Sequence, residues 1–173
     1  RYGFMNKALT SPISRSAIAI GKMSAISLIA ALQASLIIGI ALAIGVTFPN
    51  PLMIIPIMGI VILFSLGFSG ISVTLAATAK SQETFWGMIN LLGMPLFMLS
   101  PALFPLELLP SWLAVIAKLN PVTYTILLVR ELMTGVSEGG VPILLSIAVI
   151  FAFVIAMVAI ASYVFTREVN KPF

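Results

Sequence analysis

The chain has 173 residues, of which 61% are hydrophobic and 8% are charged, and its formal net charge is +4. Soluble domains carry about 25% charged residues, so this composition and a mean hydropathy of +1.20 exclude a soluble domain and predict an integral membrane protein. The sequence contains no Cys, His or Asp, which excludes zinc and iron–sulfur ligation, thiol redox chemistry and every catalytic triad that needs imidazole.

The positive charge does not point to nucleic acid. The basic residues are spread over the connections between apolar runs and form no continuous stripe, whereas a nucleic-acid-binding surface gathers them on one face. Membrane orientation explains their placement better. We therefore expect no nucleic-acid partner.

The opening segment, residues 1–23, is amphipathic and basic and contains no acidic residue. Ser11 and Pro12 interrupt it, and Ser14 can cap a new helix from which Arg15 projects to water. Such a segment is typical of the anionic cytoplasmic face of a membrane. An alternative interpretation is a generic juxtamembrane anchor.

Four apolar stretches follow, and each is predicted to cross a hydrocarbon core about 30 Å thick. They are residues 24–48, 52–79, 85–103 and 141–165. The sequence thus predicts an all-α, polytopic transmembrane protein.

Several side chains inside these spans allow more than one interpretation. Gln33 is expected to bond a neighbouring helix, with a substrate path as the alternative. Met94 and Met98 lie four residues apart, but no His or Cys supports a metal site, so none is predicted. Small residues in the second span favour close packing within the chain over a dimer face or a substrate-lining face. They are Ser65, Gly67, Ser69, Gly70 and Ser72.

Residues 104–135 are too apolar for a surface loop and too often broken by proline for one straight span. We predict an external re-entrant hairpin, in which two short helices dip into one face of the bilayer. The breaks lie at Pro105, Pro110 and Pro121. Pro110 suits the first turn of the first helix, where its missing N–H has no partner to lose.

The second helix of the hairpin has predictable ends. Asn120 precedes Pro121, and a residue before proline is pushed away from helical torsions, so the first helix ends here. Thr123 can cap a second helix over residues 124–134, which Gly135 closes.

The charged and the aromatic side chains of the hairpin each allow two interpretations. An ion at the bilayer centre costs about 2.5–3.5 kcal/mol, so Glu107 and Arg130 are expected to tie the two ends of the hairpin together. Independent anchoring at the headgroup level is the alternative. Trp112 and Tyr124 either offer an amphipathic surface to a lipid-like or aromatic cargo or anchor the hairpin among headgroups.

The distribution of cations predicts the orientation. After four crossings the opening segment and the tail lie on one side together with seven of the nine Lys and Arg residues, and only Lys118 and Arg130 lie on the other. This bias places both ends in the cytoplasm and the hairpin outside.

No nucleotide-binding loop is present, since Gly21 and Lys22 are followed by Met23 rather than by Ser or Thr. The chain is therefore expected not to be an enzyme and to hold no cofactor. No acidic residue lies inside a predicted span, which weakens the case for an ion-coupled carrier.

Three stretches resemble the membrane subunit of a type-2 ABC exporter, the permease class that includes daunorubicin-resistance, lipid and polysaccharide transporters. Residues 9–22 are similar to the cytoplasmic coupling segment of that class and residues 99–124 to its external re-entrant hairpin, while Arg130 matches the basic residue that follows the hairpin. Pro101 departs from the glycine that many drug exporters have at this place.

The resemblance implies six spans in the full protein. Because the chain begins at Arg1, we expect an amphipathic leader and two spans upstream. It also implies a second permease copy and a separate ATP-binding subunit, which would bind the ATP. The implied location is the plasma or inner membrane, in contact with its lipid, and the implied cargo is a drug, lipid, glycolipid or polysaccharide.

The resemblance also implies roles for single residues. The residues implied to couple the chain to the ATPase subunit are Ser11, Pro12, Ser14, Arg15 and Gly21. The residues implied to form the hairpin and to line the exit are Pro105, Glu107, Pro110, Trp112, Asn120, Pro121, Tyr124 and Arg130. The residues themselves leave two alternatives open, an ion-coupled secondary transporter and a non-transporting membrane assembly protein.

Overall fold

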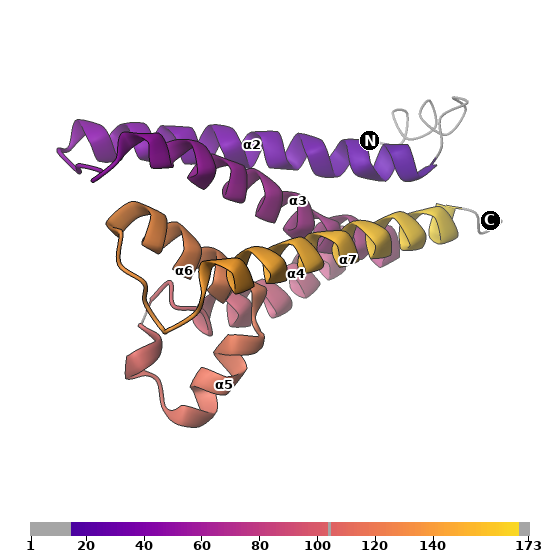
Figure 1. Ribbon diagram of the computed structural model, residues 1–173. Coiled ribbons are helices and arrows are strands. Elements are labelled where there is room, and N and C mark those ends of the chain that lie inside the picture. Colours follow the sequence, from indigo (N-terminus) through magenta and orange to yellow (C-terminus); the bar gives the residue numbers. More distant parts are fainter. Residues whose placement is uncertain (1–14, 104, 170–173) are drawn as a thin grey trace.

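The computed structural model in Figure 1 describes residues 15–103 and 105–169, and within these ranges every regular element is a helix. Two single 3-10 turns, η1 (Pro51–Met53) and η2 (Leu106–Leu108), accompany the α-helices. The α-helices are α2 (Arg15–Ala43), α3 (Ile54–Thr78), α4 (Gln82–Met98), α5 (Ser111–Leu119), α6 (Pro121–Thr134) and α7 (Ile143–Val169). The predicted all-α, polytopic fold class is confirmed.

Three of these helices are long and apolar enough to cross a membrane: Ser16–Ala43, Pro51–Thr78 and Ile143–Glu168. The pair α5 and α6 passes the same test only as a unit and is bent by 90° between its halves. An aqueous domain would have to bury these apolar surfaces, yet large hydrophobic side chains remain exposed along α2, α4 and α7. The chain is therefore a multi-pass membrane protein.

Helix α2 contains two segments that were predicted to be separate. The predicted coupling helix and the predicted span from residue 24 form one continuous helix from Arg15 to Ala43. Gly21 does not interrupt it, because a glycine inside a helix costs only about 1 kcal/mol relative to alanine. The helix ends five residues earlier than predicted, and Gly45 follows with a positive φ of 92°.

Helix α4 is shorter than the predicted span 85–103. It has 17 residues and ends at Met98, which gives it a length of about 25 Å. Pro101 explains the early end, because Ser100 precedes it and is pushed away from helical torsions. At the other end, hydrogen bonds from the backbone N–H of Glu83 and from Ser81 lower the pKa of Glu83. That α4 crosses the membrane stays a prediction.

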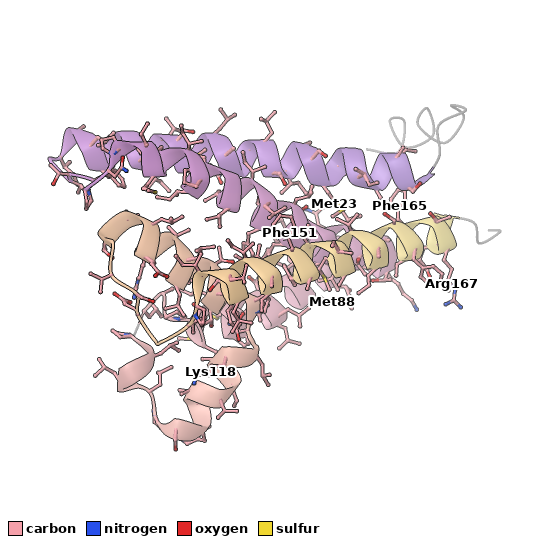
Figure 2. All side chains as sticks on the ribbon, viewed as in Figure 1. Met23, Met88, Lys118, Phe151, Phe165 and Arg167 are labelled. Atoms are coloured by element: carbon pink, nitrogen blue, oxygen red, sulfur yellow. The ribbon has the colours of Figure 1, made fainter. Side chains whose placement is uncertain are left out.

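The described ends of the chain, at the start of α2 and the end of α7, lie at the same end of the bundle in Figure 1. A buried cluster joins the helices there and consists of Ala19, Met23, Val73, Ala161 and Phe165. A second cluster, nearer the middle of α7, joins α6 to α7 and consists of Leu128, Ile150 and Val154. Figure 2 labels Met23 on α2 and Phe165 on α7.

Helices α3 and α7 approach each other closely because α3 presents glycine to α7. A Cβ added to Gly67 would lie 3.0 Å from the Cα atom of Val154, and one added to Gly70 would lie 2.9 Å from the carbonyl oxygen of Met157. Ser69, between them, is buried and donates to the carbonyl oxygen of Leu66 at 2.7 Å. These small residues pack within the chain, as the sequence favoured.

Gln33 does not make the predicted contact. Its side chain is exposed on α2, so in the part of the chain that the structure describes it does not bond a neighbouring helix. The alternative interpretation, a polar position facing a substrate path, stays a prediction.

Candidate functional site

The segment predicted to form a re-entrant hairpin, residues 104–135, turns at Asn120 and is called the hairpin below. The backbone N–H of Asn120 donates to the carbonyl oxygen of Ala117 at 3.1 Å and ends α5. Its side-chain Oδ1 accepts a hydrogen bond from the backbone N–H of Val122 at 3.0 Å and so caps the start of α6. One residue therefore closes one helix and opens the next, and the axes of the two helices differ by 90°.

The break at Asn120 and the closure of α6 at Gly135, which has a φ of 73°, are both confirmed. The predicted start of α6 is corrected. The helix begins at Pro121, and its cap is Asn120 rather than Thr123. Proline occupies the first helical position, where its fixed φ is already helical and its missing N–H has no partner to lose.

Thr123 and Tyr124 instead close the end of α5. The hydroxyl of Thr123 is buried and donates to the carbonyl oxygen of Ala117 at 2.7 Å. The hydroxyl of Tyr124 donates to the carbonyl oxygen of Lys118 at 2.7 Å. The last carbonyls of a helix have no partner within it, so these two side chains satisfy the end of α5 and fix the angle of the bend.

A long-range hydrogen bond joins the hairpin to α4. The side-chain Nδ2 of Asn120 donates to the carbonyl oxygen of Leu96, 24 residues away, at 2.6 Å. Leu96 lies in the last turn of α4, so this bond satisfies one of the carbonyls that the helix leaves free. Asn120 is only 5% exposed. We call the set of bonds made by Asn120, Thr123 and Tyr124 the hairpin clasp.

Arg130 makes a second link across the same region. Its Nη2 donates to the carbonyl oxygen of Pro101, in the loop after α4, at 2.8 Å. Its Nη1 donates to Glu138, in the loop before α7, at 3.0 Å. The side chain of Glu107 lies outside the described residues, so its pairing with Arg130 stays a prediction.

We expect Arg130→Met to lower the free energy of unfolding by about 1.5–3 kcal/mol, the usual value of a hydrogen bond made by a charged group. Glu138→Gln should cost less than about 1 kcal/mol, because the side chains of Arg130 and Glu138 are 31% and 37% exposed and surface ion pairs contribute little. Steric-trapping or SDS unfolding of the purified protein would measure both.

The double variant Arg130→Glu, Glu138→Arg should not restore stability. The carbonyl oxygen of Pro101 would then face a carboxylate, which cannot donate a hydrogen bond to it. Full recovery in the exchanged protein would show that the ion pair, and not the bond to Pro101, holds the loops. Glu107→Gln costing as much as Arg130→Met would instead support the pairing of Glu107 with Arg130.

The outer face of α5 is apolar and open. Trp112 is 65% exposed and Ile116 is 41% exposed, and neither is covered by another element of the described chain. Pro105 and Pro110 are themselves the residues directly before η2 and α5, and each has a non-helical ψ of 146°. Pro110 therefore precedes α5 instead of lying in its first turn. This face can take either of its predicted roles, a cargo surface or an interfacial anchor.

Two of the predicted coupling residues, Arg15 and Gly21, are described, and they lie at the other end of the molecule. Arg15 is the first residue of α2, although its side chain lies outside the described residues, and Gly21 is exposed on the same helix. Ser11, Pro12 and Ser14 lie outside the described residues. Figure 2 shows the separation through Lys118 on α5 and Arg167 near the far end of α7. The structure thus brings the hairpin residues together and keeps them apart from the start of α2.

Sequence reasoning missed the partners of the hairpin residues. It did not find the carbonyls of Leu96 and Pro101 or the carboxylate of Glu138, because the first two are main-chain groups that no side-chain pattern reveals. Among the described residues no group of three His, Cys, Asp or Glu side chains could hold a metal ion.

The geometry defines a class of protein: a polytopic helical membrane protein in which the bent helix pair α5 and α6 is bonded to the end of a neighbouring helix. Residues 1–134 match the family described as ABC-2 type transporter. The chain belongs to this family, so the resemblance drawn from its sequence is confirmed.

Curated relatives carry the name "Putative transport permease ycf38". The protein of Cyanophora paradoxa is 33% identical over 132 residues, which cover 76% of this chain and 46% of the relative. That of Pyropia yezoensis is 31% identical over 139 residues, which cover 79% and 47%. The chain thus spans less than half the length of these relatives. No solved structure matches it.

Proposed function

We propose that the chain is the membrane permease subunit of an ATP-driven exporter, working with a separate ATP-binding subunit and a second permease copy. The hairpin clasp supports this proposal most directly, because it fastens the bent pair α5 and α6, which we place on the outer side, to α4 in a chain that belongs to a transporter family. The cargo would be hydrophobic or amphipathic, namely a drug, lipid, glycolipid or polysaccharide. The permease would reside in the plasma or inner membrane with its ends in the cytoplasm.

In this proposal the chain supplies no catalytic residue and no cofactor site, and the partner subunit binds and hydrolyses ATP. The segment from Ser11 to Gly21 would dock on that subunit. Because α2 runs without a break from Arg15 to Ala43, a movement at its start would be carried along the helix. The packing of Met23 against α3 and α7 would pass the movement to the rest of the bundle.

The hairpin would then act as a lid or exit lining on the outer side. Asn120 and Arg130 bond it to the end of α4 and to the loop that follows. A tilt of α4 would therefore move α5 and its exposed Trp112 with it. The four spans would consist of α2, α3, α4 and α7.

Reversing the charge of Arg15 tests the coupling. We expect Arg15→Glu in the full-length protein to weaken copurification with the ATP-binding subunit about tenfold, which corresponds to a loss of about 1.4 kcal/mol. Transport per ATP hydrolysed, measured in proteoliposomes, should fall with it. Arg167→Glu is the matched control, because Arg167 is a cation at the same end of the bundle on α7.

Unchanged coupling in Arg15→Glu would remove Arg15 from the mechanism. The same proteoliposomes test the class of transporter. Transport that needs an ion gradient and no ATP would replace the proposal with a secondary carrier, and no transport of any amphipathic cargo would favour an assembly role.

A further inference from the structure

An open pocket of about 380 Å³ lies between α5 and the loop before α7. Ala114 and Lys118 line it from α5, and Leu106 lines it from η2. Gly139 and Gly140 line it from the loop. Its volume lies within the range of about 300–1,000 Å³ that is usual for small-molecule sites, so it has room for a small polar headgroup.

The shape of the pocket is fixed by the residues around it. Leu106, Ala117 and Leu127 form a buried cluster that joins η2, α5 and α6. On the loop side, Gly139 and Gly140 have positive φ values of 69° and 62°, which residues with a side chain rarely adopt. At these two positions the loop contributes main chain alone, and the pocket stays open.

Lys118, which Figure 2 labels on α5, gives the pocket a positive charge. Its side chain is exposed and makes no ion pair or hydrogen bond to another described residue. Glu138 does not neutralise it, because its carboxylate is bonded to Arg130 at 3.0 Å. Within the described ranges the backbone N–H of Gly140 also makes no hydrogen bond. One cation and one main-chain donor are therefore available, a combination that suits an oxyanion.

The remainder of α5 points to a lipid as the source of that oxyanion. Trp112, Val115 and Leu119 are 65%, 62% and 81% exposed. Their spacing of three and four residues places them on one side of the helix, and Lys118 lies at the edge of that side. Such an amphipathic helix lies in a membrane interface with its apolar face about 5–10 Å into the boundary between headgroups and acyl chains. A lysine at the edge of that face then reaches the level of the phosphates.

We propose that the pocket binds the phosphate of an anionic phospholipid, such as phosphatidylglycerol, whose acyl chains lie along Val115 and Leu119. The ammonium group of Lys118 and the backbone N–H of Gly140 donate to the phosphate oxygens. The proposal depends on α5 lying at a membrane surface and not on ATP-driven transport, so a failure of the proposed transport function leaves it standing.

The charge of Lys118 decides which headgroup is preferred. Phosphatidylcholine carries its own cation beside the phosphate, and that cation competes with Lys118 for the phosphate oxygens. Phosphatidylglycerol has no cation, so its phosphate gains more from the ammonium group. Hydrogen bonds between charged partners are about twice as strong as neutral ones, which makes this contact the main source of selectivity.

Native mass spectrometry of the full-length protein tests this, after release from nanodiscs that contain equal amounts of phosphatidylglycerol and phosphatidylcholine. We expect the wild type to retain phosphatidylglycerol about fivefold better, which corresponds to about 1 kcal/mol. Lys118→Gln should abolish the preference and leave the fold intact, because the side chain is exposed. Lys80→Gln is the matched control, since Lys80 is also exposed but does not line the pocket.

Filling the pocket gives the second arm. Ala114→Phe should abolish the preference, and Val115→Phe is its control because Val115 is exposed on α5 outside the pocket. If Ala114→Phe lowers the unfolding midpoint, the smaller Ala114→Met takes its place. A preference that is missing in the wild type, that persists in Lys118→Gln or that is lost equally in Lys80→Gln would overturn the proposal. Displacement of the lipid by excess inorganic phosphate would also overturn it and assign the pocket to a free anion.

Discussion

Replacing Asn120 with alanine is expected to lower the free energy of unfolding by about 2–4 kcal/mol. The substitution removes the donor to Leu96 and the acceptor for Val122, and both main-chain groups then lose a partner in a partly buried place. A buried polar group without a partner costs about 1–3 kcal/mol, and the loss of a helix cap costs about 0.5–2 kcal/mol. Steric-trapping unfolding in lipid would measure the change.

Two further variants separate the two bonds of Asn120. Asn120→Ser keeps a good capping residue for α6 but is too short to reach Leu96. Asn50→Ala is the matched control for the cap alone, because Asn50 also precedes a proline and accepts from Leu52 at 3.0 Å, but on an exposed turn. We expect Asn50→Ala to cost about 1 kcal/mol or less. Equal losses for Asn50→Ala and Asn120→Ala would show that the bond to α4 contributes nothing.

Gly70→Ala is expected to destabilise the bundle by about 1–3 kcal/mol, the usual cost of overpacking a tight interface. The new Cβ would lie 2.9 Å from the carbonyl oxygen of Met157 and 3.1 Å from its carbonyl carbon. These are backbone atoms that cannot turn aside, so α3 and α7 must separate. The loss should also loosen the buried contacts of Val154. The unfolding assay used for Asn120 measures it.

Gly59→Ala is the control for Gly70→Ala. Gly59 lies on the same helix, and nothing lies within 4 Å of a Cβ added there. The substitution should be neutral or stabilise α3 by up to about 1 kcal/mol, because alanine favours a helix more than glycine does. If both alanine variants behave alike, the close approach of α3 and α7 does not limit stability.

The sequence predicted those features of the hairpin that depend on neighbouring residues. Proline after Asn120 restricts the local backbone, and Gly135 supplies the positive φ that a helix end uses, so both boundaries could be read from a few residues. The bond from Asn120 to Leu96 spans 24 residues and ends on a main-chain oxygen. No local pattern encodes such a bond, and it becomes visible only when the helices are placed.

The same distinction holds for the bundle. The small residues of α3 predicted a close helix contact, but only the structure identifies α7 as the partner of Gly67 and Gly70. The continuity of α2 through Gly21 was missed, because a single glycine gives no clear signal within an apolar run. Similarly, the early end of α4 follows from Pro101, three residues beyond Met98.

In the proposed arrangement, in which α4 crosses the membrane, the shortness of α4 has a consequence for the bilayer. A helix of about 25 Å falls some 5 Å short of a hydrocarbon layer of about 30 Å. Backbone that leaves a helix at such a depth must be shielded from lipid by protein, and Asn120 provides part of that shield by bonding the carbonyl of Leu96. In that arrangement the polypeptide itself would relieve the hydrophobic mismatch. Beside α4, a polar group on its way across would meet a thinner apolar barrier than elsewhere in the membrane.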